Sequence, residues 1–407
     1  MQNEFIIIST ADWDNPFWTN KQHIAKRLAD RGYKVLYLNS MGLRAPSGNS
    51  KDLKRILRRF KLMFKGLQQR HDNLWVWSPI VIPYQKSSLV RKLNFLISKY
   101  FIKYYAKKLN FSNYILWTYN PISQPLLNKG EVTSVYHCVD EVSVQPGMPE
   151  EVIREQELLL VKNVDIVFAT SQSLYEKRKS INTATYYSAN VADFDHFSQA
   201  RTKNYEMPME LKNLQGPIIG FIGAISGYKL DYQLIYEIAQ SNPDKNFVFI
   251  GQVGEGDPKT NVSLIQQLKN VYLIGPKAYE ELPRYLCQFD VCLLPNNLNE
   301  YTKNMFPMKF FEYLAAGKPV VMTPLHALQE YYHLCYVAKN PKEFSEGIND
   351  ALNEKNGQNL NELVNSRISE AKLHDWESRI DNMLDKVIQM NTHDINGKIG
   401  IYDAKGI

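Results

Sequence analysis

The stretch that most constrains the fold lies in the C-terminal third of the chain. Asp290–Pro295, D-V-C-L-L-P, is an apolar run of the kind that forms a buried parallel strand. Pro307 suits the first turn of a helix, because the N–H group that proline lacks would be unpaired there. Gly317 suits the residue just past the helix end, and Pro319 prevents the helix from continuing. The order strand, loop, helix, sharp stop and strand predicts half of a doubly wound α/β unit.

The first turn of this predicted helix carries a cation and, one turn later, a carboxylate. Met308 and Lys309 open the helix, and Glu312 lies three residues after Lys309 on the same face. Helix N-termini hold phosphate through free N–H groups and the positive end of the dipole. Lys309 would add a point charge there. The pattern therefore suggests a diphosphate at Lys309 and a ribose at Glu312, although an isolated K-x-x-E is usually an ordinary exposed pair.

The whole string from Pro307 to Val321 resembles the donor-site motif of the GT-B glycosyltransferases, P-x-K-x-x-E-Y-x-A-x-G-x-P-V-V. The resemblance implies an α/β fold of two Rossmann-like, doubly wound domains facing a cleft. It also implies that Glu312 binds the ribose hydroxyls and Lys309 the donor phosphates. Many retaining members carry an E-x7-E pair, whose first position here is Asn304. The string is more similar to inverting relatives such as the xanthan glucuronosyltransferase and the teichuronic acid glycosyltransferases.

Two further segments of the second half are expected at the same sheet edge. Pro217–Gly223 predicts a strand that ends in glycine before a loop of small residues. The loop lacks the full G-x-G-x-x-G fingerprint, but glycine lets the backbone approach a diphosphate closely. The loop resembles a GT-B donor loop, so we expect Gly223 and either Lys229 or Tyr228 to contact the donor. Pro276 follows a predicted strand at the position where the resembling family contacts the base with its backbone.

Length and composition are those of a globular chain with more than one domain. The 407 residues are 44% hydrophobic and 22% charged, and no apolar run is long enough to span a bilayer. The first residues lack a basic segment, so we expect no signal peptide. The four cysteines form no C-x-x-C pair, which favours reduced thiols in a cytoplasmic protein.

The first domain opens with strand, helix and strand, at Phe5–Ser9, Asn20–Arg31 and Lys34–Asn39. The loop after the first strand should lie at the carboxyl edge of the sheet, where ligands of open α/β folds bind. We therefore expect this loop and the start of the helix to contact the acceptor. The candidate residues are Asp12, Trp13, Trp18 and His23.

Each of these candidates has a competing explanation. Asp12 and Asp14 form a D-x-D, the metal–diphosphate motif of GT-A glycosyltransferases, but its place after the first strand indicates a chance match, and we expect no metal. Trp13 and Trp18 are suited to stack on a sugar ring or simply to pack the loop. His23 is suited to face the cleft, although a single histidine is more often structural.

The candidate base follows the predicted strand Val132–Val139. Asp140 lies just past the carboxyl end of this strand, the position from which a side chain points toward the ligand edge. An inverting transfer needs one base to accept the proton of the acceptor hydroxyl, and Asp140 is our choice. Its alternative role is to cap a helix, and Glu141 is expected to be a surface charge. The segment also resembles the Y-D-x-x-D-[DE] string of the teichuronic-type relatives, with His137 where they often carry Asp.

Two basic amphipathic segments, 51–70 and 87–109, are predicted helices of the first domain. Their apolar residues should pack on the sheet. Their surplus of lysine and arginine should attract the anionic inner face of the cell membrane. The same charge would suit nucleic acid, but the sequence contains no recognisable nucleic-acid module.

The domain boundary is expected in a polar stretch without periodicity. The predicted divisions are an acceptor domain, a linker, a donor domain, a helix crossing back to the first domain and a loose tail, at 1–199, 200–215, 216–373, 374–390 and 391–407.

Together these features predict a metal-independent hexosyl- or glycuronosyltransferase of cell-surface polysaccharide synthesis, such as capsule or exopolysaccharide. It would be cytoplasmic and peripheral to the membrane. The expected partners are a nucleotide diphosphate sugar, preferably a UDP-sugar, and a glycan or lipid-linked acceptor, with no further cofactor and no nucleic acid. Two alternatives remain: a nucleotide-sugar epimerase on the same fold, and a membrane-associated binding protein that has lost catalysis, which Asn304 would fit.

Overall fold

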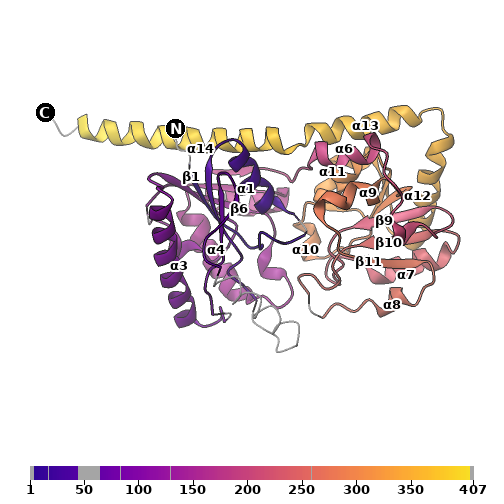
Figure 1. The fold of residues 1–407 in the computed structure, drawn as a ribbon, viewed down its shortest axis with the longest axis horizontal. Coiled ribbons are helices and arrows are strands. Elements are labelled where there is room, and N and C mark those ends of the chain that lie inside the picture. The colour runs from indigo at the N-terminus through magenta and orange to yellow at the C-terminus, as the bar shows by residue number, and fades with distance from the viewer. Residues whose placement is uncertain are drawn as a thin grey trace. The chain divides into compact units, whose positions relative to one another are not determined.

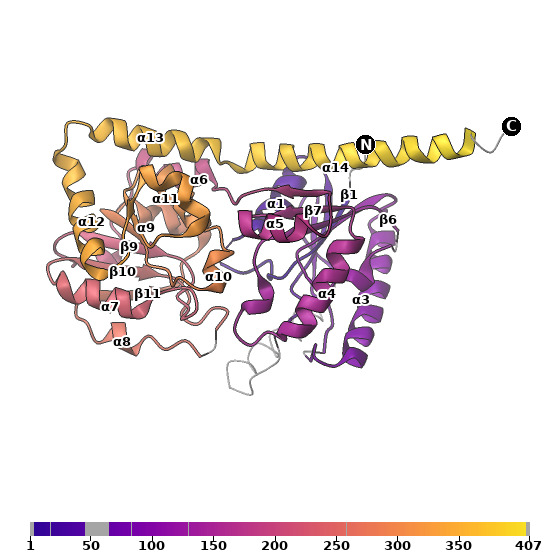
Figure 2. The ribbon, with the colours of Figure 1, turned by 180° about the vertical axis from the view of Figure 1, so that it is seen from behind.

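The computed structural model describes residues 4–16, 18–44, 65–82, 84–128, 130–257 and 259–403, and only the backbone of 391–403. The chain divides into two compact units, Met1–Ser188 together with Ile380–Ile407, and Ala189–Arg379 (Figures 1 and 2). Each unit is built around its own mainly parallel sheet, so the α/β doubly wound class is confirmed.

The first unit contains an eight-stranded sheet in the order β3-β4-β2-β1-β5-β6-β7-β8. Neighbouring strands are parallel, except that β3 pairs antiparallel with β4 at one edge. The order runs outward in both directions from β1 and β5, so the winding reverses between these two strands, which is where ligands of such sheets bind. The strands are β1 (Glu4–Ile8), β2 (Lys34–Leu38), β3 (Gln68–His71), β4 (Leu74–Trp77), β5 (Tyr114–Thr118), β6 (Glu131–Cys138), β7 (Ile166–Ala169) and β8 (Thr185–Tyr187).

Helices accompany the parallel strands of the first unit because such strands need a crossover segment between them. They are α1 (Asn20–Asp30), α3 (Ser88–Lys108), α4 (Glu150–Asn163) and α5 (Gln172–Lys179), with short 3₁₀ turns η1 (Gln124–Leu126) and η2 (Val142–Val144). The long helix α14 (Trp376–Asp403) returns to this unit from Ile380 onward. Its side chains Ile380, Met383, Leu384 and Val387 are buried at helical spacing.

The second unit contains a six-stranded parallel sheet in the order β11-β10-β9-β12-β13-β14. Here the winding reverses between β9 and β12. The strands are β9 (Ile218–Ile222), β10 (Asn246–Ile250), β11 (Val271–Gly275), β12 (Val291–Leu294), β13 (Val320–Met322) and β14 (Tyr336–Val337). The helices are α6 (Phe194–Thr202), α7 (Tyr232–Ser241), α8 (Ser263–Gln266), α9 (Leu282–Leu286), α10 (Glu300–Lys303), α11 (Met308–Ala315), α12 (Pro341–Asn353) and α13 (Leu360–Leu373). The 3₁₀ turns are η3 (Met209–Leu211), η4 (Tyr279–Glu281), η5 (His326–Leu334) and η6 (Glu354–Asn356).

The division between the units differs from the linker expected at 200–215. It falls after Ser188, and the whole 200–215 stretch lies in the second unit. The reason is that α6 packs against α9 and α11. At the other end, the loose tail expected from 391 is helical as far as Asp403, and 404–407 lie outside the described residues.

The predicted C-terminal end of the basic helix at 51–70 is wrong. Residues 51–64 lie outside the described residues, but Gln68–His71 form strand β3. Gly66 adopts a φ of +63°, a left-handed conformation that glycine tolerates and that a continuous helix through 51–70 would not contain. The following residues then pair with the edge of the sheet, where Gln68 lies opposite Val76.

The second basic helix is confirmed as α3, but its packing differs from the expectation. The face on the core carries Asn94, Phe95, Ser98, Ile102 and Tyr105. The apolar residues Leu89, Leu93, Leu96, Tyr100 and Tyr104 are instead exposed. The periodicity of the sequence did not reveal that this helix has two apolar faces, of which the sheet covers one.

Candidate functional site

Helix α11 forms as the string of Pro307 to Gly317 predicts. Pro307 is the N-cap, one residue before the helix rather than inside its first turn. Phe310, Phe311 and Leu314 are fully buried and anchor the helix in the core of the second unit. Gly317 has a φ of +68° and its N–H donates to the carbonyl of Leu314 at 2.8 Å, which ends the helix.

Lys309 and Glu312 are not an ordinary exposed pair. The Lys309 ammonium forms an ion pair with Oε2 of Glu312, and the Glu312 side chain is only 2% exposed. The Lys309 Nζ also lies 5.5 Å from the ring centroid of Phe197 on α6. The Glu312 carboxylate is therefore buried and is balanced by the charge of Lys309, whose side chain is 21% exposed.

A second layer of residues around this pair was missed by the sequence analysis. His196 on α6 stacks on Tyr279 with ring centroids 4.3 Å apart, and its Nε2–H donates to the Tyr279 carbonyl at 2.9 Å. Burial lowers the pKa of His196, and the carboxylates of Asp193 and Glu312 act against this shift. His196 is therefore close to Glu312. The sequence signal for it is the D-F-D-H-F string at 193–197, which the sequence analysis did not interpret.

The glycine turn after β9 is tied to the same helix. The hydroxyl of Tyr313 on α11 accepts from the N–H of Ile222 at 2.8 Å. The β9–β12 ladder covers only Ile219 and Gly220, so this hydroxyl takes the N–H that β12 leaves unpaired beyond the ladder. Tyr313 thereby supports the turn at Gly223, at the reversal of winding where ligands bind.

Replacing Tyr313 with Phe is expected to destabilise the protein by about 1–3 kcal/mol, because it leaves the buried N–H of Ile222 without an acceptor. Denaturant unfolding measures the loss. Tyr272→Phe is the control, because its side chain is only half-buried in β11 and no hydrogen bond of its hydroxyl appears among the described residues. Equal stability of the two variants would contradict the assigned role of Tyr313.

The other predicted donor residues lie at the same carboxyl edge of the sheet. Gly223 follows β9, Pro276 follows β11, and Met308 opens α11. Lys229 lies over the rings of Tyr228 and Tyr301, at 5.4 and 5.6 Å from their centroids. The loop that carries it is clamped from the β12 side by asparagines: Nδ2 of Asn296 and of Asn297 donate to the carbonyls of Lys229 and Gly227, at 3.1 and 2.9 Å.

Asn304, the departure from the retaining pattern, is buried and engaged locally. Its Nδ2 donates to the carbonyl of Glu300 at 2.6 Å and lies 3.2 Å from Oε1 of the same residue. A glutamate at this position would be unable to donate to these oxygens and would add a second negative charge beside Glu300. Asparagine at position 304 therefore suits the oxygen atoms of Glu300 on α10, and glutamate would not.

In the first unit, Trp13, Trp18 and His23 make successive ring contacts. Trp13 and Trp18 are 5.5 Å apart, and Trp18 and His23 are also 5.5 Å apart. His23 is buried below Trp18, with Nδ1 3.0 Å from Nη1 of Arg27, so it supports the loop from inside. Both tryptophans remain half-exposed.

The two aspartates of the D-x-D have separate environments. The backbone carbonyl of Asp12 accepts from Nε2 of Gln22 at 3.1 Å, which ties the loop to α1. The Asp14 carboxylate is exposed and forms an ion pair of 2.7 Å with Arg70. Among the described residues, no group of three or more histidines, cysteines or acidic residues is arranged to hold a metal ion.

Asp140 lies just past β6, as predicted, and its neighbours hold it from both sides. The Thr170 hydroxyl donates to the carbonyl of Val139 at 3.0 Å. On the other side, Glu141 is buried and anchored by Arg178, whose Nη1 lies 3.2 Å from Oε2 of Glu141. The expectation that Glu141 is a surface charge is therefore wrong.

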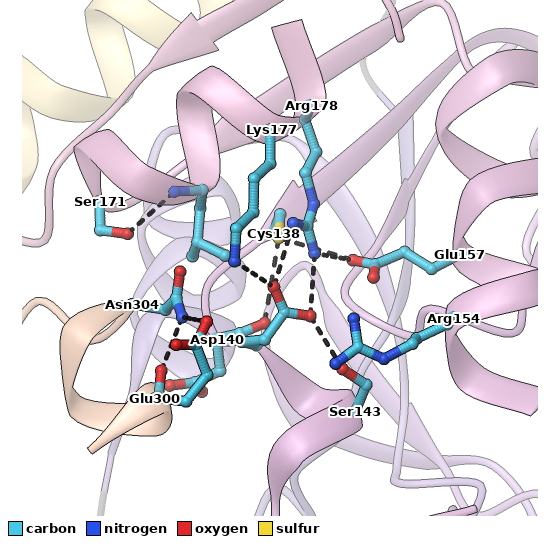
Figure 3. Close-up of polar contacts among 12 residues, drawn as sticks. Cys138, Asp140, Ser143, Arg154, Glu157, Ser171, Lys177, Arg178, Glu300 and Asn304 are labelled. Atoms are coloured by element: carbon cyan, nitrogen blue, oxygen red, sulfur yellow. Dashed lines mark hydrogen bonds and ion pairs between the residues drawn. The ribbon is translucent and has the colours of Figure 1, made fainter. Parts of the chain in front are cut away.

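Arg178 is the centre of a buried polar cluster (Figure 3). It reaches from α5 to Glu141 and, at 2.7 Å, to Oε1 of Glu157, which also accepts from the Tyr136 hydroxyl at 2.5 Å. Burial alone would raise the pKa of Glu141, but the charge and hydrogen bonds of Arg178 outweigh it and lower that pKa. Burial raises the pKa of the Cys138 thiol to about 12, and the charge of Arg178 acts against this shift. The cluster fixes the turn from which Asp140 projects.

No helix of the described residues is long and apolar enough to cross a membrane.

Solved structures match this chain along nearly its whole length. Sucrose-phosphate synthase from Thermosynechococcus elongatus superposes with a TM-score of 0.69 at 15% identity, covering 96% of this chain and 100% of that one. HepE of Anabaena, solved with UDP and glucose, gives 0.64 at 15% identity and the same coverage. This chain has the GT-B glycosyltransferase fold.

The sequence relatives agree with the GT-B fold. Residues 216–354 match the family model "Glycosyl transferases group 1". TuaH of Bacillus subtilis strain 168, assigned as a teichuronic acid biosynthesis glycosyltransferase, is 29% identical over 265 residues. This match covers 60% of the chain and 63% of TuaH, which is less than two thirds of that relative. The group 1 segment of the GT-B chain holds Gly223, Lys229, Pro276, Met308, Lys309 and Glu312.

Proposed function

We propose that this protein is a glycosyltransferase that moves a sugar from a nucleotide diphosphate sugar to a glycan acceptor in cell-surface polysaccharide synthesis. The observation that carries the proposal is the Lys309–Glu312 pair. It lies in the first turns of α11, with the Glu312 carboxylate buried, and the same helix contacts the end of β9 through Tyr313. The matches to the group 1 family and to TuaH support the same reading.

In this proposal the second unit binds the donor. Glu312 accepts hydrogen bonds from the ribose hydroxyls, and Lys309 turns from Glu312 to the diphosphate. The N-terminus of α11 and the backbone at Gly223 share the charge that develops on the leaving diphosphate, so the step requires no metal. A UDP-sugar is the proposed donor, in line with the UDP and glucose bound by HepE.

The first unit binds the acceptor, which we propose to be lipid-linked and to be met at the inner face of the membrane. Asp140 accepts the proton of the attacking hydroxyl as the bond between the anomeric carbon and the diphosphate breaks. Direct attack on that carbon inverts its configuration. Trp13 and Trp18 offer half-exposed ring faces for a sugar, with Asp12 on the same loop.

Calorimetry with UDP-glucose tests the donor site. Lys309→Ala and Glu312→Gln are each expected to weaken binding by roughly tenfold to a hundredfold, since hydrogen bonds to charged groups contribute about 1.5–3 kcal/mol. Lys342→Ala and Glu346→Gln are matched controls, because this pair is also on one helix face but is exposed at 86% and 59%. If all four variants bind the nucleotide sugar as the wild type does, the donor site is elsewhere.

A further inference from the structure

Helix α3 has an exposed apolar face that nothing in the described chain covers. Leu89, Leu93, Leu96, Tyr100 and Tyr104 recur every three or four residues and therefore share one side of the helix. Leu89, Leu96 and Tyr100 are 75%, 64% and 67% exposed. The opposite side packs on the sheet through Phe95, Ile102 and Tyr105. From Leu89 to Tyr104 the stripe is roughly 22 Å long at 1.5 Å per residue.

The charges around this stripe have one sign. The helix carries only basic ionisable residues apart from its tyrosines, with no aspartate or glutamate. Lys92, Lys103 and Lys107 are exposed near the stripe, and among the described residues none of them forms an ion pair. Exposed apolar surface of this extent marks an interaction site, and its positive border selects an anionic partner.

The charge pattern also distinguishes between two occupants. A second copy of this chain would bring two rows of lysines together around the apolar contact, and like charges facing each other across an interface are costly. An anionic lipid surface accepts leucines between its headgroups, tyrosine rings at the interface and lysines against phosphate. A lipid surface of this kind therefore accommodates the leucines, the tyrosines and the lysines of the helix together.

We propose that the outer face of α3 docks this protein on an anionic membrane, with the apolar stripe entering the headgroup region and the lysines contacting lipid phosphates. This goes beyond electrostatic attraction, because the exposed leucines supply an insertion surface that charge alone does not. It fits the lipid-linked acceptor proposed above. Docking itself needs neither donor nor catalysis, so the test of docking is independent of the test of the proposed transferase activity.

Co-sedimentation of the full chain with vesicles tests the proposal. The wild type is expected to bind vesicles of phosphatidylglycerol and phosphatidylcholine in equal parts, and to bind phosphatidylcholine alone at least tenfold more weakly. Leu89→Glu with Leu96→Glu should reduce binding to the mixed vesicles at least tenfold. Lys92→Gln with Lys103→Gln should reduce it as well and weaken its dependence on salt.

The matched control is Leu373→Glu, since Leu373 is an equally exposed leucine, at 74%, at the end of α13. It should leave vesicle binding unchanged. A thermal shift by UDP-glucose that persists in Leu89→Glu with Leu96→Glu shows that the donor site and the fold are intact. Vesicle binding that is insensitive to the α3 variants overturns the proposal, and so does a lipid-free dimer that the leucine variants dissociate.

Discussion

Asp140→Asn is expected to reduce kcat by about 10²- to 10⁴-fold, the range for removing a general base, with nearly unchanged affinity for the donor. The amide has the size of the carboxylate but does not accept the proton of the acceptor hydroxyl. The turn that carries Asp140 is fixed by Thr170 on one side and by the Glu141–Arg178 pair on the other, so the substitution should leave the backbone in place. The loss should therefore report chemistry and not folding.

Transfer of sugar from UDP-glucose, measured as UDP released in the presence of acceptor, checks this result. Asp14→Asn is the control, because Asp14 is an exposed carboxylate of the same unit that pairs with Arg70. An equal loss in both variants would mean that Asp140 is not the base. Product analysis without acceptor addresses the epimerase alternative, which predicts an altered nucleotide sugar. A wild type with neither activity would support the binding-protein alternative.

Arg178→Met is expected to destabilise the first unit by about 3–5 kcal/mol, because it removes the cation from a buried pair and leaves its partners uncompensated. The Arg178 side chain is 7% exposed, and the carboxylates of Glu141 and Glu157 are 5% and 9% exposed. Methionine fills much of the volume of the arginine stem, so the loss arises mainly from the two charges that remain. Denaturant unfolding measures it.

The pH dependence gives the same prediction a second readout. Arg178 lowers the pKa of Glu141 in the folded state. In the wild type, the stability that ionised Glu141 contributes is therefore fully present above its unfolded-state pKa and is lost as the pH falls through its folded-state pKa. Without Arg178, burial would raise the pKa of Glu141. Protonation of its carboxylate at low pH would then remove the unpaired buried charge that destabilises the variant. The difference in stability between wild type and variant should therefore shrink as pH falls.

Arg154→Met is the matched control for this arginine. Arg154 pairs with Glu150 one turn away on α4, and both side chains are 55% exposed. Such surface pairs contribute about 0.3–0.5 kcal/mol, so this variant should unfold almost as the wild type does. Similar destabilisation in the two arginine variants would show that the buried cluster does not hold the turn at Asp140.

The sequence predicted the sheets well because their strands are buried on both faces. The strand predicted at Lys34–Asn39 forms at Lys34–Leu38, since such strands appear as short apolar runs between polar turns. Helix α11 was predicted for a different reason. Its proline, glycine and paired charges are local signals that need no tertiary contact.

The errors arose where distant residues decide the outcome. Glu141 is buried because Arg178 comes from another helix, and no local pattern shows that partner. Helix α6 belongs to the second unit because it packs on α9 and α11. The outer face of α3 has the same periodicity as its packed face, so the sequence alone did not show which one the sheet covers.

The return of the chain through α14 has a consequence for how the protein is made. The first unit is assembled from the two ends of the chain, with the whole second unit inserted between them. Ile380, Met383 and Val387 are buried, and Asp381 forms its 2.6 Å ion pair with Arg31, which lies 350 residues earlier in the chain. The first unit therefore lacks the part of its core that α14 supplies until this C-terminal segment has been synthesised.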